Sequence, residues 1–200
     1  MSIEHLLAFN LALLAALVSP GPALLYAVRA TLGGGRAAGL ATGCGLATMA
    51  AAWTLMALLG LEGLFRLFPW AYTSFKVIGA LYLLYLAWSA WRGARHPIGQ
   101  AARPKTRAFV GGLLVNLANP KSVLFSAAVL VVIFPAGLTV TDKAIIVANH
   151  LAVEVMAYGA FALLLSTQAV GQRYLRLKPM FDRLSALILG GLGLRLMVER

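Results

Sequence analysis

The chain has 200 residues, of which 61% are hydrophobic and 12% are charged. Soluble domains are about 45–50% apolar and about 25% charged, so the composition excludes an ordinary soluble domain, a disordered chain and a coiled coil. The net charge of +11 comes from Lys and Arg residues that cluster between apolar runs. That distribution is typical of membrane-protein loops and not of a nucleic-acid-binding surface. We therefore expect an integral membrane protein that contacts lipid and has no nucleic-acid partner.

Six apolar segments follow one another along the chain and leave room for little else. They cover residues 3–27, 37–61, 65–91, 109–134, 144–169 and 181–198. Each is close to the roughly 20 residues that a helix needs to cross a bilayer, and none shows the alternation of barrel strands. A tight turn near Glu62 and Gly63 is expected between the second and third segments. The predicted fold class is therefore an all-α polytopic membrane protein with about six transmembrane helices.

The distribution of Lys and Arg predicts how these helices are oriented. Residues 93–107 form the longest and most basic connection, with linker-like Pro97, Gly99 and Pro104, and we expect them to form a cytoplasmic loop. With six spans, the basic connections after the first and fifth segments also lie inside, and both termini are periplasmic. A five-span alternative, with one apolar segment re-entrant or peripheral, would move one terminus to the inside.

The same loop divides a single transmembrane domain, residues 1–200, into a first half at 1–92 and a second half at 108–200. At an offset of one hundred residues, Pro20 of the first half corresponds to Pro120 of the second half. An odd number of spans in each half requires the second half to insert upside down. The pattern therefore predicts two inverted three-helix repeats, whose broken first and fourth helices meet at a substrate site.

Deep within the first segment lie Ser19, Pro20, Gly21 and Pro22. Each proline removes a backbone donor and clashes with the preceding turn, and the glycine adds flexibility, so a broken helix is expected. The polar groups freed by such a break need protein partners or a hydrated cavity. Proline and glycine also produce simple packing kinks in membrane helices. Two prolines around one glycine, echoed in the fourth segment, favour a functional break.

The fourth segment contains a second break together with an embedded charge. Its residues of interest are Asn116, Asn119, Pro120 and Lys121. A charge as deep as Lys121 is costly unless it is paired or faces water, so an intramembrane lysine indicates a functional site. Lys121 and the backbone amides opened by Pro120 are suited to a carboxylate ligand. The alternative is that Lys121 only neutralises a buried carboxylate.

Glu154, in the fifth segment, is the only acidic residue that the sequence places near the middle of a span. A carboxylate there can carry a proton or receive an ammonium group, and a static ion pair with Lys121 or Lys76 is the alternative. His150 precedes it by four residues on the same helix face, and we expect a hydrogen-bonded interface residue rather than a relay. Thr48 is a further candidate, although such hydroxyls commonly bond to their own backbone.

Several runs of this sequence resemble the signatures of one transporter family, the lysine exporter and homoserine/threonine efflux family (LysE/RhtB). The runs are VSPGP at 18–22, GRAAGL at 35–40, GALYLLYLAW at 79–88, FVGGLLVNLANPK at 109–121 and GGLGLRL at 190–196. The run at 109–121 is the most specific of them. The resemblance covers essentially the whole chain, in order and at the spacing of the family.

The resemblance implies a bacterial inner-membrane exporter of amino acids or related small metabolites, driven by the proton motive force and often a homodimer. It also implies that Glu154 occupies the acidic position that many members have in their fifth segment. The acidic residue common in the second segment of the family is replaced here by Ala50 beside Met49. Because the expected site is otherwise apolar, a neutral or aliphatic amino acid is favoured over a cationic one.

Other functions stay open on the sequence alone. One alternative is an exporter of a non-amino-acid metabolite or an ion, which would use the same fold. Another is a non-transporting membrane scaffold, but a scaffold would not need two broken helices. A membrane-embedded enzyme would need clustered acids, histidines or a nucleophile at one membrane face. The sequence contains no glycine-rich phosphate loop, nucleophile elbow or metal-ligand cluster, and Cys44 is its only cysteine. We therefore expect a transporter without a cofactor or a metal.

Overall fold

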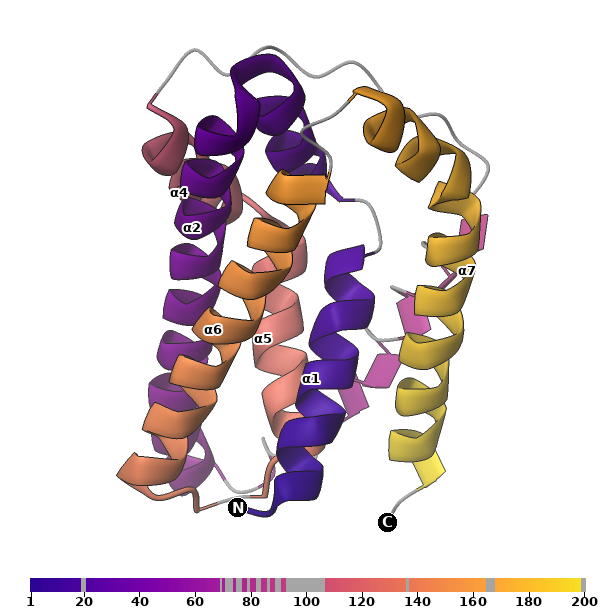
Figure 1. Ribbon diagram of the computed structural model, residues 1–200. Coiled ribbons are helices and arrows are strands. Elements are labelled where there is room, and N and C mark those ends of the chain that lie inside the picture. Colours follow the sequence, from indigo (N-terminus) through magenta and orange to yellow (C-terminus); the bar gives the residue numbers. More distant parts are fainter. Residues whose placement is uncertain are drawn as a thin grey trace.

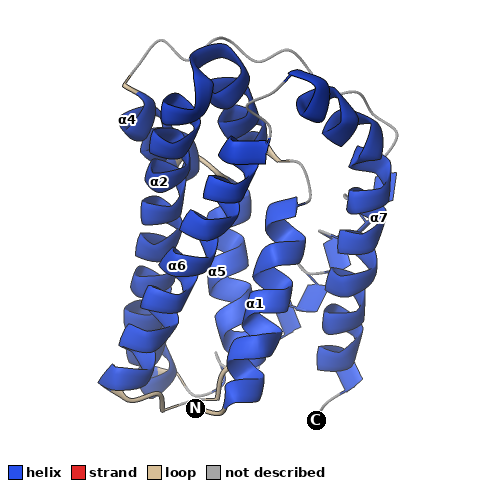
Figure 2. Ribbon diagram, in the orientation of Figure 1, coloured by secondary structure: helices blue, strands red, loops and turns tan. Residues whose placement is uncertain are grey.

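In the computed structural model, residues 1–200 are described except 19–20, 69, 71–73, 75–76, 79, 82–83, 86, 89–90, 93–106, 136, 165–167 and 199–200. The described residues form helices and short connections, with no strand among them (Figure 2). The helices are α1 (Ile3–Val18), α2 (Pro22–Leu67), α4 (Ala108–Leu117), α5 (Pro120–Ile133), α6 (Val140–Leu164) and α7 (Gln168–Val198). The expected all-α polytopic membrane fold is confirmed.

Among the described residues, two stretches are long and apolar enough to cross a membrane, Pro22–Gly60 within α2 and Val140–Leu164 in α6. The bent pair of α4 and α5 adds a third span when it is taken as one. Nearly half of the predicted third segment, 65–91, and all of the loop at 93–107 except Arg107 lie outside the described residues. The six-span count and the five-span alternative therefore stay predictions.

The first predicted segment is broken, as its prolines indicate. α1 ends at Val18, and α2 begins with Pro22 at its first helical position, where the missing amide of proline is not needed. The Gly21 carbonyl accepts the Leu25 amide at 3.0 Å and so starts the new helix. α2 then changes direction at Gly35, whose φ of 76° favours glycine. The helix that follows the break in the first segment therefore extends past the predicted end at residue 27 and reaches the kink at Gly35.

The fourth segment is broken as well. α4 ends at Leu117, α5 begins at Pro120, and the two helices are bent by 62° relative to each other. Asn119 is the N-cap of α5, because its side chain accepts a hydrogen bond from the Lys121 amide at 3.1 Å. Asparagine at the cap followed by proline at the first helical position favours a helix start, so the local sequence accounts for this break.

One predicted connection was wrong. α2 stays helical through Glu62 and Gly63 to Leu67, so no tight turn separates the segments there. A single glycine costs about 1 kcal/mol in a helix, which is too little to end a long apolar one. α7 begins at Gln168 and contains Pro179, so much of the basic connection expected before residue 181 is helical.

α6 begins at Val140, before the expected start at residue 144, because a capping box precedes it. The Thr139 amide donates to Asp142 Oδ2 at 3.1 Å, and the Asp142 amide donates to Thr139 Oγ1 at 3.1 Å. These reciprocal bonds satisfy amides that the first helical turn leaves without partners. The polar first turn of α6 is therefore stable although it belongs to no apolar run.

The packing of the helices places α2 against α4, α6 and α5, and α1 against α7, α5 and α6 (Figure 1). Gly45 of α2 and Gly112 of α4 lie so close to the facing helix that a Cβ at either position would meet backbone atoms. Small residues permit such close helix contacts in membranes. A buried apolar cluster that includes Phe9, Val129 and Ile146 joins α1, α5 and α6. The two broken segments are thereby held in one bundle.

Candidate functional site

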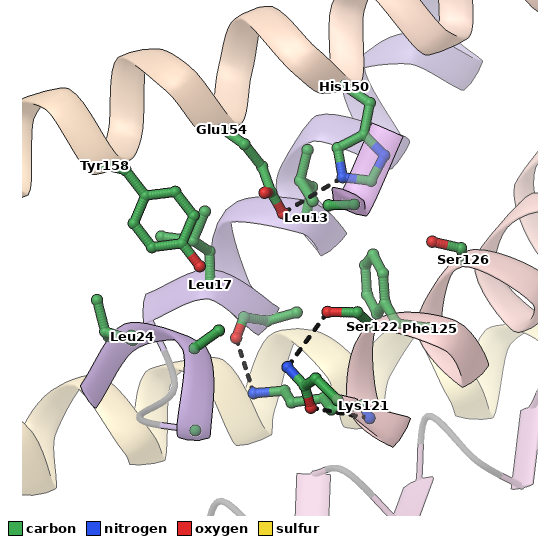
Figure 3. A pocket seen from close by; sticks show the side chains of 15 residues that line it. Leu13, Leu17, Leu24, Lys121, Ser122, Phe125, Ser126, His150, Glu154 and Tyr158 are labelled. Carbon is green, nitrogen blue, oxygen red and sulfur yellow. Dashed lines mark hydrogen bonds and ion pairs between the residues drawn. The ribbon is translucent and has the colours of Figure 1, made fainter. Parts of the chain in front are cut away.

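A cavity lies among α1, α2, α5 and α6, with residues from both breaks in its wall (Figure 3). Its volume is about 50 Å³, which is less than the roughly 300–1,000 Å³ of typical small-molecule pockets. α1 and α2 contribute apolar side chains such as Leu13, Leu17 and Leu24. α5 and α6, with the cap residue before α5, contribute the polar side chains, which are Asn119, Lys121, Ser122, Ser126, His150, Glu154 and Tyr158.

Lys121 connects the two breaks directly. Its Nζ donates a hydrogen bond to the Ala16 carbonyl in the last turn of α1, at 2.8 Å. In an unbroken helix that carbonyl would accept the amide of residue 20, but Pro20 has no amide hydrogen. The lysine ammonium therefore satisfies an acceptor that the proline leaves free. Lys121 also interacts electrostatically with Asp182 of α7.

The two asparagines of the fourth segment hold the break itself in shape. Asn119 Nδ2 donates to Ser122 Oγ at 3.3 Å, and Ser122 Oγ donates to Asn116 Oδ1. Asn116 Nδ2 donates to the Leu46 carbonyl of α2 at 2.6 Å. Both asparagines are buried. Their amide groups are therefore used to join α4, α5 and α2, which is a structural role.

The backbone amides at the start of α5 were expected to be free for a carboxylate ligand, and they are occupied. The Lys121 amide bonds to Asn119 Oδ1, and the Ser122 and Val123 amides bond to the Asn119 carbonyl at 3.1 and 3.4 Å. A capped helix start has already satisfied these donors. The cationic group that this break offers to a ligand is therefore the Lys121 side chain.

Glu154 and His150 form a buried pair on α6. His150 Nε2 lies 3.3 Å from Glu154 Oε1, and its Nδ1 lies 2.7 Å from Thr54 Oγ1 of α2. Glu154 is 7% exposed, and its Oε2 has no hydrogen-bond partner among the described residues. The hydrogen-bond partner of Glu154 in the described part of the chain is His150 and not Lys121. The predicted shared face of His150 and Glu154 is confirmed, and Oε2 is the group left for a ligand.

The structure brings together five of the predicted site residues, Gly21, Asn119, Lys121, His150 and Glu154, around this cavity. Three others lie elsewhere. Asn116 is buried at the end of α4, where it bonds to the Leu46 carbonyl of α2. Pro22 is at the exposed start of α2. Thr48 is exposed and donates to the Cys44 carbonyl of its own helix at 2.8 Å. Ser19, Pro20 and Lys76 lie outside the described residues, and only the backbone of Pro120 is described.

Asp182 is a buried acidic residue that sequence reasoning missed. It is 2% exposed, so Glu154 is not the only acidic group buried in this membrane protein. The neighbouring Arg183 makes Asp182 look like part of a polar loop. Its helical spacing to the buried Ala186 and Leu189 was the available signal, because residues at i, i+4 and i+7 share one helix face.

Comparisons with known proteins agree on one family. The family described as LysE type translocator matches residues 14–200. A threonine efflux protein of Escherichia coli (strain K12) is 28% identical over 196 residues, covering 92% of this chain and 93% of its own length. The threonine efflux protein of Salmonella typhi is 26% identical with the same coverage, and the uncharacterized membrane protein YahN of Escherichia coli is 27% identical over 186 residues. No solved structure matches.

Proposed function

This chain belongs to the LysE family of translocators, and on that premise we propose that it exports a small neutral amino acid from the cell in exchange for protons. Membership of this family makes the chain a multi-pass membrane transporter. The threonine efflux proteins among its relatives support amino acids as the substrate class. The proposal further places it in the bacterial inner membrane as two inverted halves, with both termini periplasmic and with homodimers as the assembled form.

The observation that carries this proposal is the pair of opposite charges on two sides of one cavity. Lys121 and Glu154 line it from α5 and α6 (Figure 3). A zwitterionic amino acid carries a carboxylate that suits Lys121 and an ammonium group that suits Glu154 Oε2. Charge-assisted hydrogen bonds of this kind are stronger than neutral ones. The cavity must widen to admit the substrate, because its present volume is about 50 Å³.

Substrate binding is coupled in this proposal to the break between α1 and α2. The Lys121 ammonium bonds to the Ala16 carbonyl, and a substrate carboxylate would compete for the same donor. When the ammonium turns to the substrate, the last turn of α1 loses the partner that replaces the missing Pro20 amide. Binding therefore alters the stability of a broken helix, which is the element expected to move in an inverted-repeat transporter.

The preference for a neutral amino acid follows from the number of carboxylates available. Asp182 interacts with Lys121, so Glu154 Oε2 is the carboxylate oxygen without a partner in the described part of the chain. One such oxygen is matched to the α-ammonium group of a substrate. A cationic side chain would need a second one, because a buried unpaired charge is strongly unfavourable. Leu13, Leu24 and Phe125 provide an apolar wall for the substrate side chain.

Proton coupling follows from the shared use of Glu154. Both a proton and the ammonium group of a substrate bind to its ionised carboxylate, and protonation removes the charge that holds the ammonium group. Protonation of Glu154 from the outside would therefore release the amino acid and reset the carrier, which is antiport.

The test is an export assay in cells that lack their own amino-acid exporters. The cells are loaded with mixed dipeptides, and the free amino acids that leave are measured with and without this protein. We expect a few neutral amino acids to leave, and Glu154→Gln to abolish the part of the export that depends on the proton gradient, because glutamine cannot take up the proton. Thr48→Val is the matched control, since Thr48 is exposed and bonds to its own helix.

Either of two results would count against the proposal. Proton-driven export that is undiminished in Glu154→Gln would remove Glu154 from the coupling mechanism. A wild-type protein that changes the efflux of no amino acid would move the substrate class to another metabolite or an ion.

A further inference from the structure

A chain of polar side chains runs from α5 through α2 to the Glu154 carboxylate. Thr54 Oγ1 lies 3.3 Å from Ser126 Oγ and 2.7 Å from His150 Nδ1, and His150 Nε2 lies 3.3 Å from Glu154 Oε1. Thr54, His150 and Ser126 are each at most 2% exposed. The ring edge of Phe9 covers the imidazole, with the ring centroids 5.5 Å apart. The chain is therefore shielded from solvent except where Ser126, His150 and Glu154 line the cavity.

Apart from Glu154 Oε2, the polar groups of this chain find hydrogen-bond partners both when Glu154 is ionised and when it is protonated. When Glu154 is ionised, His150 Nε2–H donates to Oε1 and Nδ1 accepts the Thr54 hydroxyl. When Glu154 is protonated, its O–H donates to Nε2, Nδ1–H donates to Thr54 Oγ1, and Thr54 donates to Ser126. A hydroxyl both donates and accepts, and neutral imidazole has one nitrogen of each kind. Rotation of the hydroxyls therefore serves both states.

Building on the proposed function, we propose that His150 and Glu154 bind the exchanged proton as a single unit and that Thr54 positions the imidazole. The proton adds to the pair either at Oε1 or as imidazolium at His150, and in both cases the pair becomes more positive by one charge. Oε1 faces His150 and Oε2 has no partner. The proton and the substrate ammonium group thus act on opposite oxygens of one carboxylate.

The surroundings of His150 leave Glu154 as its ionisable partner. α1 and α2 present Phe9 and Thr54 to it, neither of which is charged. Tyr158 of α6 and Lys121 of α5 line the same cavity, and Asp182 of α7 interacts with Lys121. Glu154 is therefore the ionisable group that bonds to His150 in the described part of the chain.

The first test separates proton coupling from substrate movement. Proteoliposomes are assayed with radiolabelled threonine, once for accumulation driven by a pH gradient and once for exchange without a gradient. We expect His150→Gln to lower the ratio of driven accumulation to exchange at least about 10-fold, because glutamine keeps an N–H near Glu154 but cannot bind the proton. Thr54→Val should lower the ratio and Thr54→Ser should restore it. An unchanged ratio and pH profile in both His150→Gln and Thr54→Val would overturn the proposal.

The second test does not depend on transport, so it separates this inference from the proposed function. The purified wild-type chain is titrated by NMR with labelled imidazole nitrogens and labelled glutamate carboxyls. The chain has 3 His, and the signal lost in His150→Gln identifies His150. We expect the His150 and Glu154 signals to change in the same pH steps, as coupled groups do, and the His150 steps to change in Glu154→Gln. His150 signals that follow the same curve in wild type and Glu154→Gln would overturn the proposal, whatever the protein exports.

Discussion

The role of Lys121 depends on a backbone hydrogen bond that Pro20, elsewhere in the chain, cannot make. Pro20 cannot donate to the Ala16 carbonyl, and the Lys121 ammonium takes that place from another helix. Its ammonium group also interacts electrostatically with Asp182. The sequence indicated Lys121 and Glu154 because charges inside apolar runs are rare. It did not indicate Asp182, because that residue adjoins a basic stretch.

Replacing Lys121 should remove the response to substrate. Lys121→Met keeps the length and apolar stem of the side chain but has no ammonium group. We expect addition of threonine to raise the thermal unfolding temperature of the wild-type protein in detergent, since ligand binding stabilises the native state, and to leave Lys121→Met unchanged. A full substrate-dependent shift in Lys121→Met would show that the carboxylate binds elsewhere.

Replacing Asp182 should destabilise the fold through Lys121. Asp182→Asn removes a carboxylate that interacts electrostatically with the Lys121 ammonium, so we expect a lower free energy of unfolding. The double variant Lys121→Met with Asp182→Asn should be more stable than Asp182→Asn alone, as a double-mutant cycle of unfolding in detergent would measure. Additive effects of the two substitutions would mean that the residues do not interact.

At the scale of elements, short polar motifs set the helix boundaries and apolar runs do not. The Asn119 cap begins α5 at Pro120, and the capping box of Thr139 and Asp142 begins α6 before its apolar run. The breaks were predictable because proline and asparagine act on their own backbone. The helical stretch of α7 before residue 181 was not predictable in this way, because tertiary contacts stabilise helices whose sequence is polar.

The close crossing of α2 and α4 gives a prediction at this scale. Gly112→Ala places a Cβ against the Thr42 carbonyl and the Leu46 amide, and backbone atoms cannot move aside as a flexible side chain can. We expect a lower thermal unfolding temperature. In the control Gly60→Ala nothing lies within 4 Å of the new Cβ, so stability should rise by about 0.5–1 kcal/mol. Equal effects of both substitutions would contradict a contact at Gly112.

The whole molecule brings residues from both halves of the sequence to one cavity. Gly21 comes from the first half, and Lys121 and Glu154 come from the second. α1 begins and α7 ends at the same end of the bundle, whereas α4 begins at the opposite end (Figure 1). This arrangement agrees with termini on one side of the membrane and the basic loop before α4 on the other. The inverted repeat and the orientation stay predictions.

Cysteine labelling in intact cells checks the orientation. Cys44 is the only cysteine, so Cys44→Ala gives a background into which Ser2→Cys, Ala101→Cys and Glu199→Cys are introduced one at a time. We expect a membrane-impermeant thiol reagent to label positions 2 and 199 in intact cells, and position 101 only after the membrane is opened, as the positive-inside rule requires. Labelling of only one terminus from outside would favour the five-span alternative.

The sequence by itself determined the membrane class, the two helix breaks and the family, because composition, proline placement and local motifs act through the nearby backbone. It also singled out Lys121 and Glu154, since a charge in an apolar run is conspicuous wherever the run folds. Only the tertiary structure decided the partners of these charges. It placed Ala16 and Asp182 where they interact with Lys121, and Thr54 where it bonds to His150, the neighbour of Glu154. Ala16, Thr54 and Asp182 are far apart in sequence from Lys121 and His150, and the packing of α1, α2 and α7 alone brings them together.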